Sequence, residues 1–69
     1  MEIYRISFYD ANDFRGWNKV FNDFEKARNL YNNLCDEYYK DWGVQIVLSL
    51  CEFVDGELTS KFEVAYTEY

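Results

Sequence analysis

The side chains that usually perform catalysis are few in this chain, and none stands in a recognisable catalytic arrangement. The sequence has no histidine, so a serine or cysteine nucleophile would lack its usual imidazole base. The two cysteines, Cys35 and Cys51, are too few for a structural zinc site without histidine. The three glycines are isolated and form no phosphate-binding loop. We therefore expect no enzymatic activity, no cofactor and no metal ion.

Acidic and aromatic residues are both abundant, and this pairing indicates a style of binding. Thirteen Asp and Glu oppose seven Lys and Arg, which gives a net charge of −6, and 22% of the residues are aromatic. The charge disfavours direct binding to nucleic acid or to an anionic membrane. A basic protein surface is the complementary partner. The alternative is that the acidic surface only keeps the protein in solution.

The start of the sequence bears on the cellular compartment. Met1 runs directly into Glu2-Ile3-Tyr4, without the basic stretch and apolar run of a signal peptide. No apolar stretch is long enough for a membrane span. We expect a cytoplasmic protein in which both cysteines stay reduced.

Three stretches have the pattern of strands, and a fourth is ambiguous. Alternating side chains over residues 2–9 predict the first strand, and residues 44–54 and 58–69 predict two more. Residues 14–21 form either a short second strand that returns along the first or a loop. The last two strands meet at Asp55-Gly56, where a three-residue loop with a bulge at Gly56 aligns Leu48 with Phe62. That register keeps apolar side chains on one face.

One helix is predicted over residues 23–41, after a cap at Asn22 or Asp23. Its apolar stripe covers one face of a single-layer antiparallel sheet. The expected fold is α+β, ββαββ with strand order 2-1-3-4, in one domain over residues 1–69. The expected core contains Leu30, Leu34, Ile46, Leu48 and Phe62, with Tyr4, Ile6, Phe8, Leu50 and Val64 on the same side.

The end of this helix carries carboxylates where the helix dipole favours cations, and Lys40 offsets them only in part, by pairing with Asp36. A locally unfavourable choice of residues is a reason to suspect function; the alternative is a tolerated solvated surface. The first-choice residues for partner binding are Asp36, Glu37, Tyr39 and Asp41. The second-choice residues are Glu57, Glu63 and Glu68.

The sheet face away from the helix is a second candidate surface. Exposed apolar residues with a polar border are typical of protein interfaces. This face would serve a homodimer of a structural or accessory protein; the alternative is that the loop at 11–20 covers it. Its expected residues are Ile3, Tyr9, Val47, Cys51 and Phe53.

Three parts of the chain are similar to features of antirestriction DNA mimics. They are, in order, Ile3-Tyr4, Gly16-Trp17 and a helix with acidic residues. The chain as a whole resembles the small acidic, aromatic-rich proteins, anti-CRISPR proteins among them, that phages and mobile elements use to block host defences. The resemblance covers less than half of the chain, which has a lower density of acidic residues than those mimics. It implies an inhibitor whose carboxylates and tyrosines occupy the nucleic-acid groove of a nuclease or another nucleic-acid-binding complex.

Overall fold

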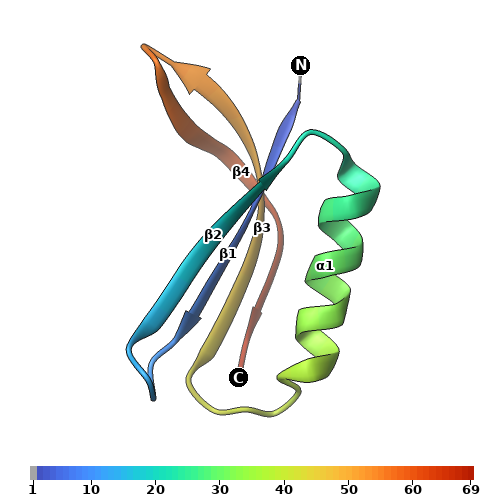
Figure 1. Cartoon of the computed structure of the whole chain (residues 1–69), viewed down its shortest axis with the longest axis vertical. Coiled ribbons are helices and arrows are strands. Elements are labelled where there is room, and N and C mark those ends of the chain that lie inside the picture. The colour runs from blue at the N-terminus through green and yellow to red at the C-terminus, as the bar shows by residue number, and fades with distance from the viewer. Residues whose placement is uncertain (1) are drawn as a thin grey trace.

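Four antiparallel strands and one helix make up the computed structural model, which describes residues 2–69 (Figure 1). Neighbouring strands are antiparallel, and their order in the sheet is β2-β1-β3-β4. The predicted α+β fold, ββαββ with order 2-1-3-4, is therefore confirmed. The elements are β1 (Ile3–Asp10), β2 (Arg15–Phe21), α1 (Phe24–Glu37), β3 (Val44–Val54) and β4 (Glu57–Glu68).

The ambiguous stretch after β1 is a strand. β2 pairs with β1 along its whole length, from Tyr4 opposite Phe21 to Asp10 opposite Arg15. Trp17 of β2 stacks on Phe8 of β1, with ring centroids 5.3 Å apart and an interplanar angle of 14°. Because Phe8 belongs to the helix-covered core, Trp17 extends that core sideways. The loop alternative for this stretch is wrong.

The helix begins where the sequence predicts but ends earlier. Asp23 is the cap, and its carboxylate accepts a hydrogen bond from the Glu25 backbone N–H at 2.9 Å. The helix ends at Glu37, and Lys40 has a left-handed backbone with φ of 60°. A helix cannot continue through that conformation. Asp41, expected in the last turns, therefore lies in the following loop.

The core lies between α1 and the middle of the sheet. The helix contributes Ala27, Tyr31 and Leu34, and it packs on β3, β1 and β2. Leu30 packs against this core from a partly buried position. Burial of these apolar side chains is the main force that holds the helix on the sheet. The sheet contributes Ile6, Phe8, Val44, Ile46 and Leu48.

The β3–β4 hairpin has a different register from the predicted one. Asp55 and Gly56 both have positive φ, 53° and 82°, as in a two-residue type I′ turn. Leu48 pairs with Ala65 instead of Phe62. With this turn and no bulge, Leu50 would pair with the charged Lys61 and Leu48 with the charged Glu63. Register shifts between Leu48 and Ser49 and between Leu50 and Cys51 each add one β4 residue, so that apolar partners replace both charges. The twist of the hairpin favours the I′ turn, and bulges correct the facing further along.

Two residues assigned to the core are exposed instead. Phe62 is 56% exposed and Val64 is 40% exposed. Figure 1 shows why: the tip of the β3–β4 hairpin bends away from α1 and extends beyond it. The 14-residue helix spans about 21 Å at 1.5 Å per residue, less than the 35 Å longest dimension of the molecule. It therefore leaves the upper hairpin uncovered.

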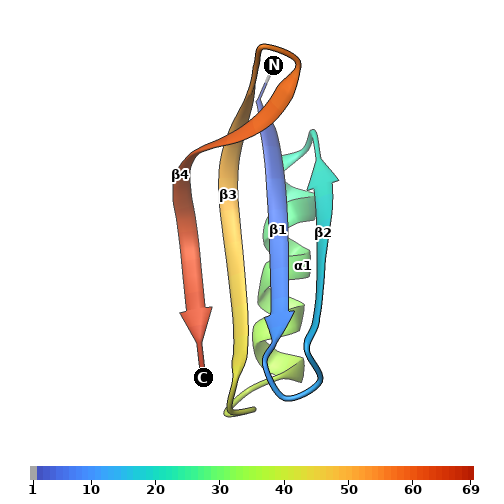
Figure 2. The same ribbon diagram turned by 90° about the vertical axis from the view of Figure 1, so that its left-hand side faces the viewer.

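The bent hairpin changes the opposite face of the sheet as well. In Figure 2 the upper part of β4 crosses β3 on the side away from α1. Ser49 and Cys51 lie on that side of β3, yet they are only 3% and 2% exposed. The face away from the helix is therefore open mainly at its lower half, near the carboxyl end of β1.

Candidate functional site

One end of the molecule is built from segments that are distant in sequence. The carboxyl ends of β1, α1 and β4 lie there, with the β1–β2 and α1–β3 loops (Figure 1). The Ala11 N–H donates to the Gly43 carbonyl at 2.9 Å, and the Gly43 N–H donates to the Tyr69 carbonyl, also at 2.9 Å. The Asn12 side-chain amide donates to the Trp42 carbonyl. These hydrogen bonds fix the two loops against the end of the sheet.

Carboxylates predominate at this end. Two basic residues lie at the same end, Arg15 at the start of β2 and Lys40 in the α1–β3 loop. The one ion pair within residues 2–69 joins Arg28 to Glu25 in the first turns of the helix, so it neutralises none of these carboxylates. The acidic residues at the carboxyl ends of β1, α1 and β4 and in the two loops are Asp10, Asp13, Asp36, Glu37, Asp41 and Glu68.

Three large aromatic side chains accompany the carboxylates. Phe14 is 84% exposed, Trp42 is 75% exposed and Tyr39 is 66% exposed. Phe14 itself has a positive φ of 52°, and Tyr39 precedes Lys40, which also has a positive φ. Both loops therefore turn sharply at an exposed ring. We refer to these three aromatic residues and the six carboxylates above as the acidic aromatic end.

Two shallow hollows lie in this region. The first, of about 270 Å³, lies between the tip of the α1–β3 loop and the end of β4, and Trp42, Glu68 and Tyr69 line it. The second, of about 200 Å³, is lined by Asp13 and Asp41 among others. Hollows of this size accept single side chains of a protein partner more readily than a small-molecule substrate.

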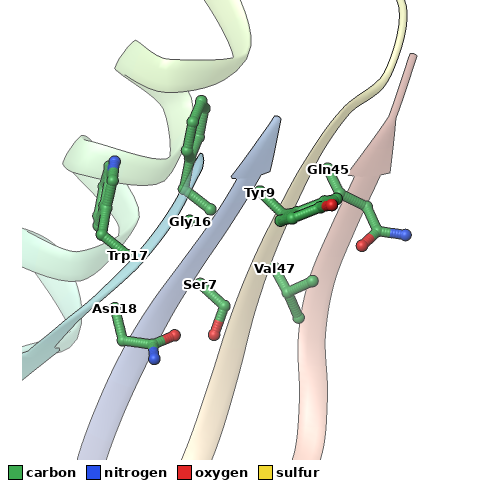
Figure 3. A pocket seen from close by; sticks show the side chains of 8 residues that line it. Ser7, Tyr9, Gly16, Trp17, Asn18, Gln45 and Val47 are labelled. Carbon is green, nitrogen blue, oxygen red and sulfur yellow. The ribbon is translucent and has the colours of Figure 1, made fainter. Parts of the chain in front are cut away.

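A third hollow lies on the sheet face away from the helix, close to the same end. Its volume is about 270 Å³. Figure 3 shows Ser7, Tyr9, Asn18, Gln45 and Val47 around it, from three neighbouring strands. The lining is a mixture of amide, hydroxyl and apolar groups without a charged side chain. It offers hydrogen bonds and apolar contact to a bound group.

A small polar network connects this face to the acidic aromatic end. The Gln45 side-chain amide donates to the Tyr66 hydroxyl at 2.9 Å, and the Tyr66 hydroxyl donates to the Glu68 carboxylate. The hydrogen bond to Glu68 is the main reason that the pKa of Tyr66 is raised above its usual value. Loss of the phenol proton would place two negative charges in contact.

The first-choice residues from the sequence lie together. Asp36 and Glu37 occupy the last turn of α1, and Tyr39 and Asp41 follow in the loop; all four are exposed. The ion pair expected between Asp36 and Lys40 is not formed. The Lys40 ammonium instead lies 5.4 Å from the centroid of the Tyr39 ring. Asp36 and Glu37 therefore remain opposed to the helix dipole without a compensating cation.

The second-choice residues do not form one site. Glu68 belongs to the acidic aromatic end through its place at the end of β4. Glu57 lies beside the Asp55-Gly56 turn, at the far tip of the hairpin. Glu63 lies between them, opposite Ser49. The twelve-residue length of β4 separates these three carboxylates, so they do not lie together as Asp36 and Asp41 do.

Sequence reasoning missed Asp10, Asp13, Phe14 and Trp42 as parts of this surface. Phe14 and Trp42 were visible as bulky residues in turn-prone stretches beside Asp13 and Gly43. Their proximity depends on the strand order, which places the β1–β2 loop beside the α1–β3 loop. Local periodicity carries no information about that contact.

The expected dimer face is only partly open. Cys51 is buried, which contradicts its assignment to an exposed patch, and Ile3 and Val47 are half-buried. Tyr9 is 43% exposed, whereas Phe53 is 66% exposed on the projecting hairpin. The 11–20 stretch does not cover this face, because residues 15–21 lie in the sheet itself. The cover comes from the bent hairpin.

The described residues, 2–69, contain no group of three His, Cys, Asp or Glu side chains arranged to hold a metal ion. In the same part of the chain, no helix has the length and apolar character needed to cross a bilayer. Comparison with protein-family models, with curated proteins and with solved structures found no match to this chain.

Proposed function

We propose that this chain is a small inhibitor that docks its acidic aromatic end onto the basic surface of a nucleic-acid-handling protein. The observation that carries the proposal is the exposure of Phe14, Tyr39 and Trp42 among unpaired carboxylates. Large rings are costly to leave in water, because each buries about 150–250 Å² when it finds a partner. An end built of such rings is better suited to an interface than to bulk solvent.

The two kinds of side chain have separate roles in this proposal. Trp42 and Tyr39 supply rigid contact area, and arginine or lysine side chains of the partner stack on their faces. The carboxylates of Asp36, Glu37 and Asp41 attract the basic partner over distance and speed its association. A surface that binds phosphates also attracts carboxylates, so a nucleic-acid-binding groove is the complementary target. The proposed place of action is the cytoplasm of a host cell.

The test is a charge reversal that leaves the core untouched. In a triple variant, Asp36→Lys, Glu37→Lys and Asp41→Lys invert the exposed charge beside Tyr39. The matched control carries Glu52→Lys, Asp55→Lys and Glu57→Lys, the same charge change on exposed residues of the hairpin. The partner is first recovered from a lysate of the host cells, and its association is then measured by surface plasmon resonance at low and high salt.

The triple variant at the helix end is expected to associate about 10–1000-fold more slowly at low salt and to lose its salt dependence. The hairpin control is expected to change little, because its carboxylates lie at the opposite end. Trp42→Ala is expected to act on dissociation instead, with a loss of about thirtyfold in affinity for a central aromatic contact. If the helix-end variant binds like the unmodified protein, the assignment of this surface is wrong.

A second candidate function is a homodimer that forms through the lower half of the face away from the helix. Tyr9 and Tyr66 favour it, because they lie 43% and 46% exposed on two strands of that half. The dimer would bury Val47 between subunits. Light scattering at high protein concentration decides this point, since a monomeric mass would exclude the dimer.

A further inference from the structure

The two edge strands of the sheet, β2 and β4, differ in how regular their outer edges are. Alternate backbone N–H and C=O groups of an edge strand point outward and are free to pair with another chain. β4 interrupts its edge with two bulges. β2 pairs with β1 over seven consecutive residues without a register shift. Its outer edge is therefore regular, exposed along nearly its whole length and ready to accept a strand.

The chemistry beside the β2 edge is basic and apolar, in contrast to the rest of the chain. β2 carries Arg15 and Lys19 and no carboxylate. Beside its end lies a hollow of about 440 Å³, larger than the three described above. Apolar side chains and two ammonium groups line that hollow: Ile3, Val20, Phe21, Lys19 and Lys26, together with the Asn22 side chain. This site is separate from the acidic aromatic end.

The two faces of β2 differ in charge, so they select the pattern of an added strand. Arg15 and Lys19 are on the helix-covered side, the side of Trp17. Gly16, Asn18 and Val20 alternate with them on the other side. A strand that adds to this edge would place one set of its side chains beside two cations and the other set beside Val20. The complementary segment alternates acidic with apolar residues.

A second copy of this chain does not fit this edge. Antiparallel pairing of β2 with β2 of another copy would set the Arg15 and Lys19 side chains of both copies on one face. Like charges across neighbouring strands are destabilising. Basic residues on an edge strand are a common device against self-pairing. They do not exclude an acidic strand, for which the same charges are attractive.

We infer that the edge of β2 binds an extended acidic segment of another protein by strand addition. Main-chain hydrogen bonds along β2 supply affinity, and the hollow beside Val20 and Phe21 accepts an apolar side chain. Lys19 and Lys26 select glutamate or aspartate next to it. The chain then has two unlike binding surfaces, an acidic aromatic end for a basic protein and a basic edge for an acidic segment.

The probe is a capped peptide of alternating valine and glutamate, seven residues long to match β2. Binding is followed by NMR chemical-shift changes and by hydrogen exchange of the β2 amides. One control peptide has lysine in place of glutamate, and another carries N-methyl groups on its backbone amides, so that neither edge of the peptide can pair with β2. We expect the glutamate peptide to change the chemical shifts of the β2 amides and to slow their hydrogen exchange. The lysine peptide is expected to bind at least about tenfold more weakly, and the N-methylated peptide is expected not to bind.

One double variant and one single variant complete the test with exposed residues only. Lys19→Glu with Lys26→Glu is expected to reverse the preference, so that the lysine peptide becomes the better ligand. Lys61→Glu on β4 is the control and should leave the preference as it was, because its side chain lies on the other edge strand. Equal binding of both peptides, shifts that map to β4, or no binding at millimolar peptide would each overturn the inference.

Discussion

At the carboxyl end of β4, the Tyr66 hydroxyl lies between an amide donor and a carboxylate acceptor. It receives a hydrogen bond from Gln45 and donates one to Glu68. The donated bond favours the neutral phenol and raises its pKa, and the Gln45 bond acts in the opposite direction. The pKa of Tyr66 therefore indicates whether its hydrogen bonds to Gln45 and Glu68 are formed.

Glu68→Gln is expected to lower the pKa of Tyr66 towards its ordinary value. The amide can still accept the phenol hydrogen bond, but it removes the negative charge that opposes ionisation. The measurement is an NMR titration of the Tyr66 ring between neutral pH and pH 12, with Glu57→Gln as control. A Tyr66 titration that Glu68→Gln leaves unchanged would show that the two side chains do not interact in solution.

Burial of tyrosines in the core leads to a pH dependence of stability. Burial is the main cause that raises the pKa of Tyr31, whose hydroxyl is hydrogen-bonded to Thr67. A raised pKa in the folded state means that folding favours the protonated form. The associated stability is complete below the unfolded pKa of about 10 and is lost as pH rises through the folded value. Thermal melts should therefore show a falling melting temperature above about pH 10, less steep in Tyr31→Phe.

At the scale of the elements, the connections decide how the strands align. The Asp55-Gly56 turn and the α1–β3 loop both use a glycine with positive φ, 82° at Gly56 and 90° at Gly43. Their surroundings differ. A Cβ atom on Gly56 would meet nothing within 4 Å, whereas a Cβ on Gly43 would lie 2.9 Å from the Asn12 side-chain nitrogen. Asn12 cannot withdraw without losing its hydrogen bond to Trp42.

Gly56→Ala is expected to cost about 1–2 kcal/mol, the backbone penalty of a left-handed L-residue. Gly43→Ala is expected to cost more, by the further 0.5–1.5 kcal/mol or so of a lost hydrogen bond. Urea denaturation measures both. Asn12→Ala removes the hydrogen bond alone, so in its background the two glycine substitutions should cost nearly the same. A persistent difference there would mean that Asn12 is not what Gly43 avoids.

For the whole molecule, one helix on one face of the sheet makes the two sides of β3 unequal. Leu48 is 1% exposed beneath the helix, whereas Val47 is half-buried on the other side. Leu48→Ala is expected to cost about 2–5 kcal/mol, because it leaves a cavity in a small core. Val47→Ala is expected to cost about 1 kcal/mol in a monomer. Thermal melts compare the two variants.

Similar losses for both variants would contradict this one-sided core unless a second subunit covers Val47. Dilution distinguishes these cases, because the loss at a subunit interface depends on protein concentration. A concentration-independent melt with equal losses would refute the assignment of faces. A concentration-dependent melt would instead support the homodimer.

The sequence by itself determined that β1, β3 and β4 are strands and that α1 is a helix, together with most of their facing, whereas β2 stayed ambiguous. Alternation in β1 and β3 and the three-and-four spacing of α1 depend only on local geometry, so Ile6, Ile46 and Leu48 were assigned to the core correctly. The exposed acidic turn of the helix, with Asp36 and Glu37, could be read in the same way. Charge and aromatic content likewise belong to the sequence alone.

The tertiary structure decided what lies next to what. Phe62 leaves the core because it lies between two bulges on the edge strand β4, whereas α1 packs on β1, β2 and β3. No local pattern records which strands the helix covers. Phe14 and Trp42 lie at the same end as the helix carboxylates only because strand order places two loops side by side. Such contacts between distant segments arise from the packing of the whole sheet, and they form only when the chain is folded.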